Sequence, residues 1–525
     1  MADELARVTE ESARGGFFLF SGALLATVIM AVSAILIGRL LGPELYGQYN
    51  LVLVIPSLLL LVTDFGINIG ITKFAASMRV NGKSESVATI IRRGTLFRLL
   101  VAIAVFIPSL IFAGYFAMLI NRPDFAPFIQ IASISLVFQV IFATSTAAFV
   151  GLDKSEYNAL ATNVQAIAKT ALQVSFVLLG FSIAGALIGY VGGYIIASVL
   201  AGAILYLRLL KFRKSNDRES FGETLKILTR YGAPLYASVL LSGLLPLYQQ
   251  IILAFFASDA AIGNYKAASN FVALLAVIPG SITTALLPAF SKLDSSTTEK
   301  VNTFFKRANK YTCVLIVPTT ILIILFARQI VEIIYGPIYN SAPLFLMISS
   351  LSYLLVVIGS LGLTSLFNGL GETRLTLQVT MINFSLLIIL TPILASAYDV
   401  TGALIASLIS SIAGASYAAY IASKKLKVQF NFGPTARIYL AAGLSSIPSL
   451  ILLLFSLTNG ILTLIIGAAT YLFIFITLMP LIRIVNEGEL NALASVTGKI
   501  PILKLIVKPF LQYQRKILPK PRQTY

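Results

Sequence analysis

The chain has 525 residues, of which 58% are hydrophobic and only 11% charged, and it contains no histidine and no tryptophan. A water-soluble protein of this length cannot bury so many apolar residues, so the composition excludes a soluble protein and makes the lipid bilayer its main solvent. The missing histidine removes the commonest metal ligand and general base, which argues against a hydrolase or metalloenzyme. The single cysteine, Cys313, excludes an intrachain disulfide.

Apolar runs separated by short polar breaks follow one another along the chain. A spanning helix needs about 20 mostly apolar residues to cross roughly 30 Å of hydrocarbon. We therefore expect an all-α integral membrane protein with about fourteen spans, at 15–41, 49–74, 94–120, 125–150, 157–180, 183–207, 231–256, 262–290, 311–335, 342–369, 373–394, 401–423, 435–456 and 459–483. The first run is too long for a signal-peptide core, so we expect this helix to be retained.

The basic residues indicate the orientation of these helices. With the N-terminus inside, the inner loops hold most of the Lys and Arg residues, at 79–93, 208–230, 292–310 and 424–427, and the outer loops hold almost none. The positive-inside rule then predicts that both termini are cytoplasmic. The net charge of +18 follows from this topology and does not indicate a nucleic-acid partner. The basic tail around 499–508 either lies on anionic headgroups or is solvated.

The chain contains an internal repeat with a shift of about 216 residues. Gly47-Gln48-Tyr49 meets Gly263-Asn264-Tyr265, and the segments 185–188 and 402–405 both read Gly-Ala-Leu-Ile. Each unit holds six helices, an even number, so the two copies have the same orientation and form two lobes. The alternative is chance similarity among apolar helices. The predicted parts are a cytoplasmic segment 1–14, an N-lobe 15–210, a linker 211–230, a C-lobe 231–423, a further helix pair 435–483 and a basic tail 484–525.

Four motifs carry a resemblance to a known family. The segment 38–49, which reads GRLLGPELYGQY, resembles the first helix-to-helix turn of the polysaccharide-transport, O-antigen flippase-like branch of the multidrug/oligosaccharidyl-lipid/polysaccharide flippase superfamily. The segments 64–66, 231–235 and 262–267 add to the resemblance, which covers roughly residues 15–480. It implies a flippase that moves a polyprenyl-phosphate- or polyprenyl-pyrophosphate-linked oligosaccharide across the plasma membrane, and it does not identify the glycan.

Ionisable residues within the spans are the candidate substrate site, because a charge in hydrocarbon is costly and should face a wet interior. Asp64 and Lys169 are the deepest, near the middle of the second and fifth spans. Three cations nearer the span ends, Arg39, Arg98 and Lys266, can snorkel to the interface. We expect the cations to neutralise a lipid phosphate in a central cavity. The alternative for each residue is an internal ion pair or an interface anchor.

Amides within or beside the spans are candidates for binding the sugar. Gln139, Gln165 and Gln249 are the main ones, and interhelical hydrogen bonding is their alternative use. Tyr46, Tyr49 and Tyr265 are interpreted as an interfacial belt rather than as platforms for sugar rings.

Energy for transport has no nucleotide source in this sequence. Gly82-Lys83-Ser84 resembles the end of a phosphate-binding loop, but Ser77 stands where the first glycine is required. We therefore expect no nucleotide, cofactor or metal, and coupling to a gradient. Asp64 is the candidate coupling residue, because desolvation would let it exchange a proton. The competing interpretation is a permanent pair with a Lys or Arg of a neighbouring helix.

Three other functions remain as alternatives. A drug or metabolite antiporter of the same superfamily normally has twelve helices, and the extra pair 435–483 argues against it. A glycan polymerase or glycosyltransferase usually needs a long outer loop or an acidic metal site, whereas Asp124, Asp259 and Asp399 are isolated in the sequence. A non-transporting scaffold does not explain Asp64 and Lys169 within the bilayer. We expect a monomer whose partners are the lipid bilayer and the lipid-linked oligosaccharide.

Overall fold

A computed structural model describes residues 2–80, 84–210, 220–292, 298–455, 460–497 and 501–518. These segments form helices and no strand. Ten helices are long and apolar enough to cross a membrane, and a bent pair, Ala342–Ile358 with Ser360–Gly369, raises the number to eleven in the described part of the chain. The prediction of an all-α membrane fold is confirmed, whereas the count of about fourteen spans stays a prediction.

Three predicted turns between spans lie inside long helical stretches. The stretches Phe18–Leu61, Ser155–Leu209 and Thr373–Lys425 each cover two predicted spans or parts of them. Each is interrupted by non-helical backbone close to the predicted turn, at Gly42, at Gly180 and at Tyr398 with Asp399. Gly42 has a φ of 72° and precedes Pro43, so the kink is local to the GP step of the 38–49 motif.

The chain divides into two compact units, Met1–Ala267 and Ala268–Tyr525. The helices of the first unit are α1 Ala2–Val52, α2 Val54–Leu61, α3 Ile67–Val80, α4 Ser84–Ile111, α5 Ala113–Leu119, α6 Ala126–Ser133, α7 Ser135–Gly151, α8 Ser155–Phe176, α9 Ser182–Ala203 and α10 Phe221–Phe256, with short turns η1 Pro123–Phe125, η2 Val177–Phe181 and η3 Ile204–Leu209. Helix α11, Asp259–Leu275, crosses the boundary.

The second unit continues from the end of α11. Its helices are α12 Val277–Ser291, α13 Thr298–Leu325, α14 Ala327–Ile334, α15 Ala342–Leu351, η4 Ser352–Ile358, α16 Ser360–Gly369, α17 Thr373–Lys425, α18 Phe432–Leu454, α19 Gly460–Leu481, α20 Glu487–Thr497 and α21 Pro501–Ile517.

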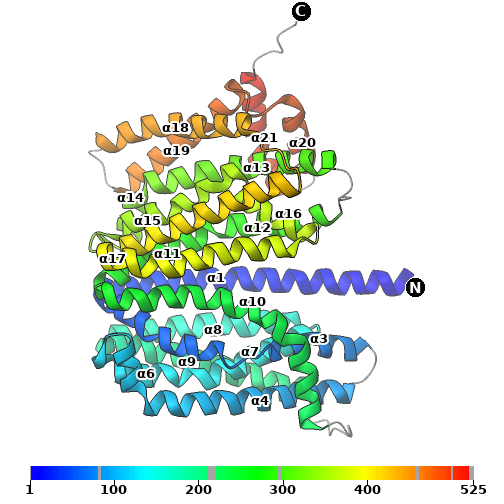
Figure 1. The fold of residues 1–525 in the computed structure, drawn as a ribbon, viewed down its shortest axis with the longest axis vertical. Coiled ribbons are helices and arrows are strands. Elements are labelled where there is room, and N and C mark those ends of the chain that lie inside the picture. The colour runs from blue at the N-terminus through cyan, green and yellow to red at the C-terminus, as the bar shows by residue number, and fades with distance from the viewer. Residues whose placement is uncertain are drawn as a thin grey trace, which may run out of the picture. The chain divides into compact units, whose positions relative to one another are not determined.

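Small residues bring the helices of the first unit close together. In Figure 1, α7, α8 and α9 run side by side, and α1 also packs on α8. Gly189 and Gly193 of α9 face α8, where a Cβ on Gly193 would lie 2.5 Å from the Cβ of Lys169. Likewise, a Cβ on Gly22 of α1 would lie 2.5 Å from the Cβ of Ala159 of α8. This small-xxx-small packing fixes the position of α8 between its two neighbours.

Helix α10 begins earlier than the predicted span at 231. Ser220 and Glu223 form a capping box that starts the helix at Phe221, ten residues before the predicted boundary. Residues 211–219, the first nine residues of the predicted linker 211–230 and including Arg213, lie outside the described residues. Helix α10 packs on α2, α3 and α4 in the first unit. The lobe boundaries expected from the repeat stay a prediction.

The C-terminal helices α20 and α21 pack on each other, and α20 contacts the N-terminal half of α13. The Glu489 carboxylate accepts hydrogen bonds from Lys310 Nζ at 2.7 and 2.9 Å, and Gln514 of α21 is buried against α19. Residues 498–500 and 519–525 lie outside the described residues.

Candidate functional site

The second predicted span is not one continuous helix. The prediction of a single helix over 49–74 is wrong, because the backbone breaks between α2 and α3 at residues 62–66. Phe65 and Gly66 have φ values of 49° and 79°, a left-handed conformation that glycine adopts most easily. A Cβ on Gly66 would also lie 2.1 Å from the carbonyl carbon of Gly232, so α10 approaches the break too closely for any side chain. Asp64 lies within this break.

Arg98 of α4 satisfies the polar groups that the break exposes. Its guanidinium lies 3.2 Å from the Asp64 carboxylate and donates to Asn68 Oδ1 and Thr144 Oγ1, each at 2.8 Å. It also contacts the Thr63 carbonyl at 3.5 Å. The Arg98 side chain is 2% exposed and that of Asp64 is 13% exposed. In hydrocarbon, free carbonyl and carboxylate groups are costly, so this network lets a span interrupt its helix.

Asp64 therefore forms an ion pair with an arginine of a neighbouring helix, as the competing interpretation expects. Its Oδ2 faces Arg98, and its Oδ1 accepts a hydrogen bond from the Asn68 backbone N–H at 3.2 Å, which caps the start of α3. The proton-exchanging role of Asp64 stays a prediction.

Lys169 has a different environment on α8. Its Nζ lies 3.7 Å from the Met30 sulfur and 5.2 Å from the centre of the Tyr190 ring, both weak partners for an ammonium group. Within the part of the chain that the structure describes, Lys169 forms no ion pair. Its three N–H donors are thus left without a strong acceptor.

Gln165 lies one helical turn before Lys169 on the same helix. The side chain is 6% exposed, and its Nε2 has no hydrogen-bond partner. Residues four apart share one face of a helix, so an unsatisfied amide donor and an unpaired ammonium lie on neighbouring turns. A buried donor without a partner costs about 1–3 kcal/mol, which a ligand oxygen would offset.

Some of the other candidate residues have hydrogen-bond partners within the protein, and others form no ion pair with a described carboxylate. Gln139 is buried and donates to Ser135 Oγ at 2.8 Å, and Gln249 is half-buried and has partners within the protein. Arg39 of α1 is exposed and Lys266 of α11 is half-buried, and neither forms an ion pair with a described carboxylate. The described structure does not bring these residues into one cluster with Lys169 by any direct contact.

The two copies of the repeat motif contact each other in the first unit. A Cβ on Gly47 would lie 1.8 Å from the Asp259 carbonyl oxygen, and a Cβ on Gly263 would lie 1.8 Å from that of Pro43. With the offset of 216, Gly47 corresponds to Gly263 and Pro43 to Asp259, so the contact is reciprocal. Such a contact requires glycine at both positions.

A polar cluster surrounds this backbone contact. Asp259 accepts hydrogen bonds from Arg122 Nε and Gln48 Nε2, each at 2.9 Å. Arg122 also donates to the carbonyls of Ala254 and Ala257, where α10 ends. Asp259 looks isolated in the sequence, but Arg122 reaches it from 137 positions away. Sequence reasoning missed this pair, although the repeat offset signals that 43–49 and 259–265 are equivalent.

The belt interpretation of Tyr49 is wrong. The ring is 6% exposed, and its hydroxyl accepts a hydrogen bond from Gln173 Nε2 at 2.8 Å inside the first unit. A tyrosine near a predicted span end does not by itself distinguish a membrane interface from a helix interface. In the described residues no group of three or more Asp, Glu, Cys or His side chains could hold a metal ion.

Comparison with known proteins identifies the family. Residues 12–294, more than half of the chain, match the family described as polysaccharide biosynthesis proteins. The chain belongs to this polysaccharide biosynthesis family. A curated relative, an uncharacterised membrane protein of Methanocaldococcus jannaschii, is 23% identical over 262 residues. The match covers 50% of this chain and 51% of the relative, so the chain spans about half the length of the curated relative that it matches.

Solved structures show the fold of this family member. It aligns with the lipid II flippase MurJ, in an inward closed conformation, at 17% identity and a TM-score of 0.66, over 87% of this chain and 98% of that one. An inward-facing multidrug resistance transporter of the MATE family aligns at 15% identity and a TM-score of 0.58, over 76% and 94%. A MOP superfamily transporter from Pyrococcus furiosus aligns at 16% identity and a TM-score of 0.52, over 80% and 96%.

These findings confirm the predicted superfamily. They show a multi-pass membrane fold in a chain of the polysaccharide biosynthesis family.

Proposed function

We propose that this protein flips a polyprenyl-phosphate- or polyprenyl-pyrophosphate-linked oligosaccharide from the inner to the outer leaflet of the plasma membrane. The observation that carries the proposal concerns Lys169 and Gln165. Among the described residues, Lys169 has no anionic partner and the buried Gln165 amide donor has no acceptor. An oligosaccharide phosphate supplies both kinds of acceptor, phosphate oxygens for the ammonium and hydroxyl oxygens for the amide.

The physical need for such groups follows from the substrate. A phosphate and several hydroxyl groups must leave water and pass through a medium where each unpaired polar group costs several kcal/mol. Cations that have no internal partner offset this cost, whereas a cation already paired with a carboxylate adds little. We infer that Lys169, Arg39 and Lys266 serve the phosphate, and that Gln139, Gln165 and Gln249 serve the sugar.

The contact between 43–47 and 259–263 suggests how one end of the pathway closes. We propose alternating access in which this contact and the Arg122–Asp259 pair hold the outer ends of α1 and α11 together. Opening exchanges these internal bonds for bonds to water. In this proposal both termini are cytoplasmic, the protein acts as a monomer, and no nucleotide is used.

The coupling of transport to a gradient is assigned to Asp64 and Arg98 together. If Asp64 accepts a proton, its ion pair with Arg98 is lost, and the polar network at the break between α2 and α3 must rearrange. The break is thus a candidate two-state element, and its left-handed backbone at Phe65 and Gly66 is where a hinge would act.

A flipping assay in proteoliposomes tests the proposal. Purified protein is reconstituted with a fluorescent polyprenyl-pyrophosphate-linked oligosaccharide, and the fraction accessible to a membrane-impermeant reagent is followed over time. We expect Lys169→Ala to slow flipping by at least about tenfold, the effect of losing one charge-assisted hydrogen bond. Lys169→Arg, which keeps the charge, should retain part of the activity.

Lys154→Ala is the matched control. Lys154 lies at the N-terminus of the same helix, and its ammonium is exposed and 3.9 Å from Glu156. It should flip at the wild-type rate. A Lys169→Ala variant that also flips at the wild-type rate would refute the assignment. Gradient-driven efflux of ethidium without any lipid flipping would favour the antiporter instead.

A further inference from the structure

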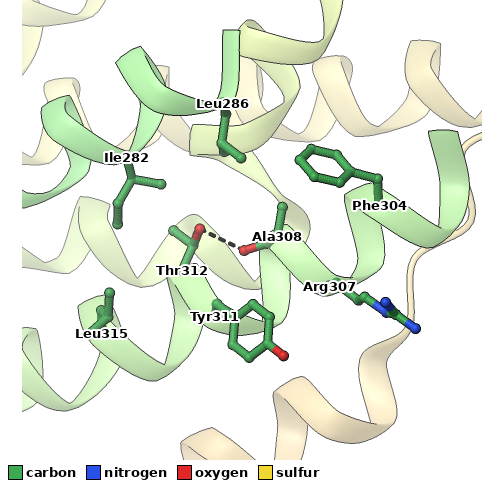
Figure 2. A pocket seen from close by; sticks show the side chains of 8 residues that line it. All are labelled: Ile282, Leu286, Phe304, Arg307, Ala308, Tyr311, Thr312 and Leu315. Carbon is green, nitrogen blue, oxygen red and sulfur yellow. Dashed lines mark hydrogen bonds between the residues drawn. The ribbon is translucent and has the colours of Figure 1, made fainter. Parts of the chain in front are cut away.

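The second unit carries a groove between α12 and α13 that has a volume of about 380 Å³. Figure 2 shows Leu286 of α12 beside Phe304 and Ala308 of α13, and Ile282 nearer to Leu315. The remaining lining residues are Arg307, Tyr311 and Thr312. Tyr311 and Leu315 are 47% and 52% exposed, so the groove is open along its length. Its lining is apolar apart from Arg307, Tyr311 and Thr312, and the Thr312 hydroxyl donates to the Ala308 carbonyl.

The cations along the first turns of α13 are not equivalent. Lys306 Nζ donates to Gln429 Oε1 at 2.8 Å, and Lys310 is held by Glu489. Arg307 lies between them, is exposed, and forms no ion pair with any described carboxylate. The groove therefore has a free guanidinium at its mouth, where a planar fork of N–H donors can bind a phosphate.

The length of the groove and the position of its cation suit a lipid at the membrane boundary. From Arg307 to Leu315 the helix rises about 12 Å, at 1.5 Å per residue. Arg307 precedes the apolar run that starts near Tyr311, on the side that the basic loops assign to the cytoplasm. A cation at headgroup level above an apolar channel suits an amphiphile with an anionic head and a hydrocarbon tail.

We propose that this groove binds an anionic phospholipid of the inner leaflet. The phosphate contacts Arg307, and one acyl chain lies along Leu286, Ala308 and Leu315. Tyr311 also donates to Glu489 at 3.3 Å, so the bound lipid adjoins the C-terminal helices α20 and α21. The site does not depend on the transported substrate, and it serves as a resident lipid site.

Native mass spectrometry of the full-length protein in detergent tests this proposal. The probes are phosphatidylglycerol, phosphatidylcholine with the same acyl chains, and undecaprenyl phosphate. We expect one phosphatidylglycerol to bind about tenfold more tightly than phosphatidylcholine, the effect of one charge-assisted contact. Arg307→Gln should remove this preference, and Ala308→Phe should block both phospholipids by filling the groove.

Lys306→Gln is the matched control, because it removes the neighbouring charge, which lies outside the groove lining. It should bind phosphatidylglycerol like the wild type. Arg307 is exposed and has no ion pair with a described carboxylate to lose, so we expect Arg307→Gln to fold. The proposal can therefore be tested with this variant even if Ala308→Phe misfolds. Equal binding of the two phospholipids, unchanged binding by Arg307→Gln, or displacement of phosphatidylglycerol by equimolar undecaprenyl phosphate would overturn the proposal.

Discussion

Two cations of the first unit, Arg98 and Lys169, differ in how their charge is satisfied. Arg98 is nearly inaccessible and is bound by Asp64, Asn68 and Thr144. Lys169 is half-buried and has only a thioether and a tyrosine ring beside it. Both were candidate substrate ligands on the same ground, a charge within an apolar span. The difference teaches that two cations in apolar spans can have opposite environments, one satisfied by a carboxylate and two polar side chains and the other not, which their position in a span does not reveal.

Replacement of Arg98 should have the largest effect on stability. Arg98→Met leaves the Asp64 carboxylate and the Thr63 carbonyl without their donor, and removal of one partner of a buried ion pair typically costs about 3–5 kcal/mol. We expect a clear fall in Tm, measured on the detergent-purified protein, and a matching loss of yield. An Arg98→Met protein as stable as the wild type would show that the break does not depend on this network.

Asp64→Asn should have an intermediate effect. The amide oxygen can still accept the Asn68 N–H, but the amide NH2 replaces the oxygen that faces Arg98, so the charge and one acceptor are lost. A charged hydrogen bond contributes about 1.5–3 kcal/mol. We expect a smaller fall in Tm than for Arg98→Met. The same protein tests coupling, because its flipping should no longer respond to an imposed proton or cation gradient while substrate binding remains. A stable Asp64→Asn variant whose flipping still follows the gradient would eliminate the coupling role.

Lys169→Met should have the smallest effect on stability. No ion pair is broken within the described residues and the methionine stem fills a similar volume, so the free energy of unfolding should change by less than about 0.5 kcal/mol or increase. Its Tm should therefore equal or exceed that of the wild type. A large fall in Tm would mean that Lys169 has a structural partner, and the contrast with Arg98 would disappear.

The sequence predicted the fold class but not the break in the second span. Residues 49–74 are apolar enough for a continuous helix, and Asp64-Phe65-Gly66 contains only one glycine as a local signal. The break depends on Arg98, 34 positions later, and on the close approach of Gly232. Both are tertiary contacts, which hydropathy does not record. The kinks at Gly42 and Gly180 were easier to predict, because glycine or proline marks each of them.

The candidate site also depends on tertiary contacts that the sequence does not show. Lys169 and Gln165 were identified from position alone, and depth in the span placed Lys169 deeper than Arg98, but the sequence does not show which of the two has partners, because those of Arg98 lie on two other segments. The Arg122–Asp259 pair was missed for the same reason.

The reciprocal contact of Gly47 and Gly263 has a consequence for local symmetry. Identical surfaces that meet around a two-fold axis contact each other in this pattern, so the backbone contact between the two motifs has a local two-fold form. Its charges do not follow that symmetry, since Asp259 corresponds to Pro43, which has no carboxylate to offer. The ion pair between Arg122 and Asp259 therefore has no counterpart at Pro43.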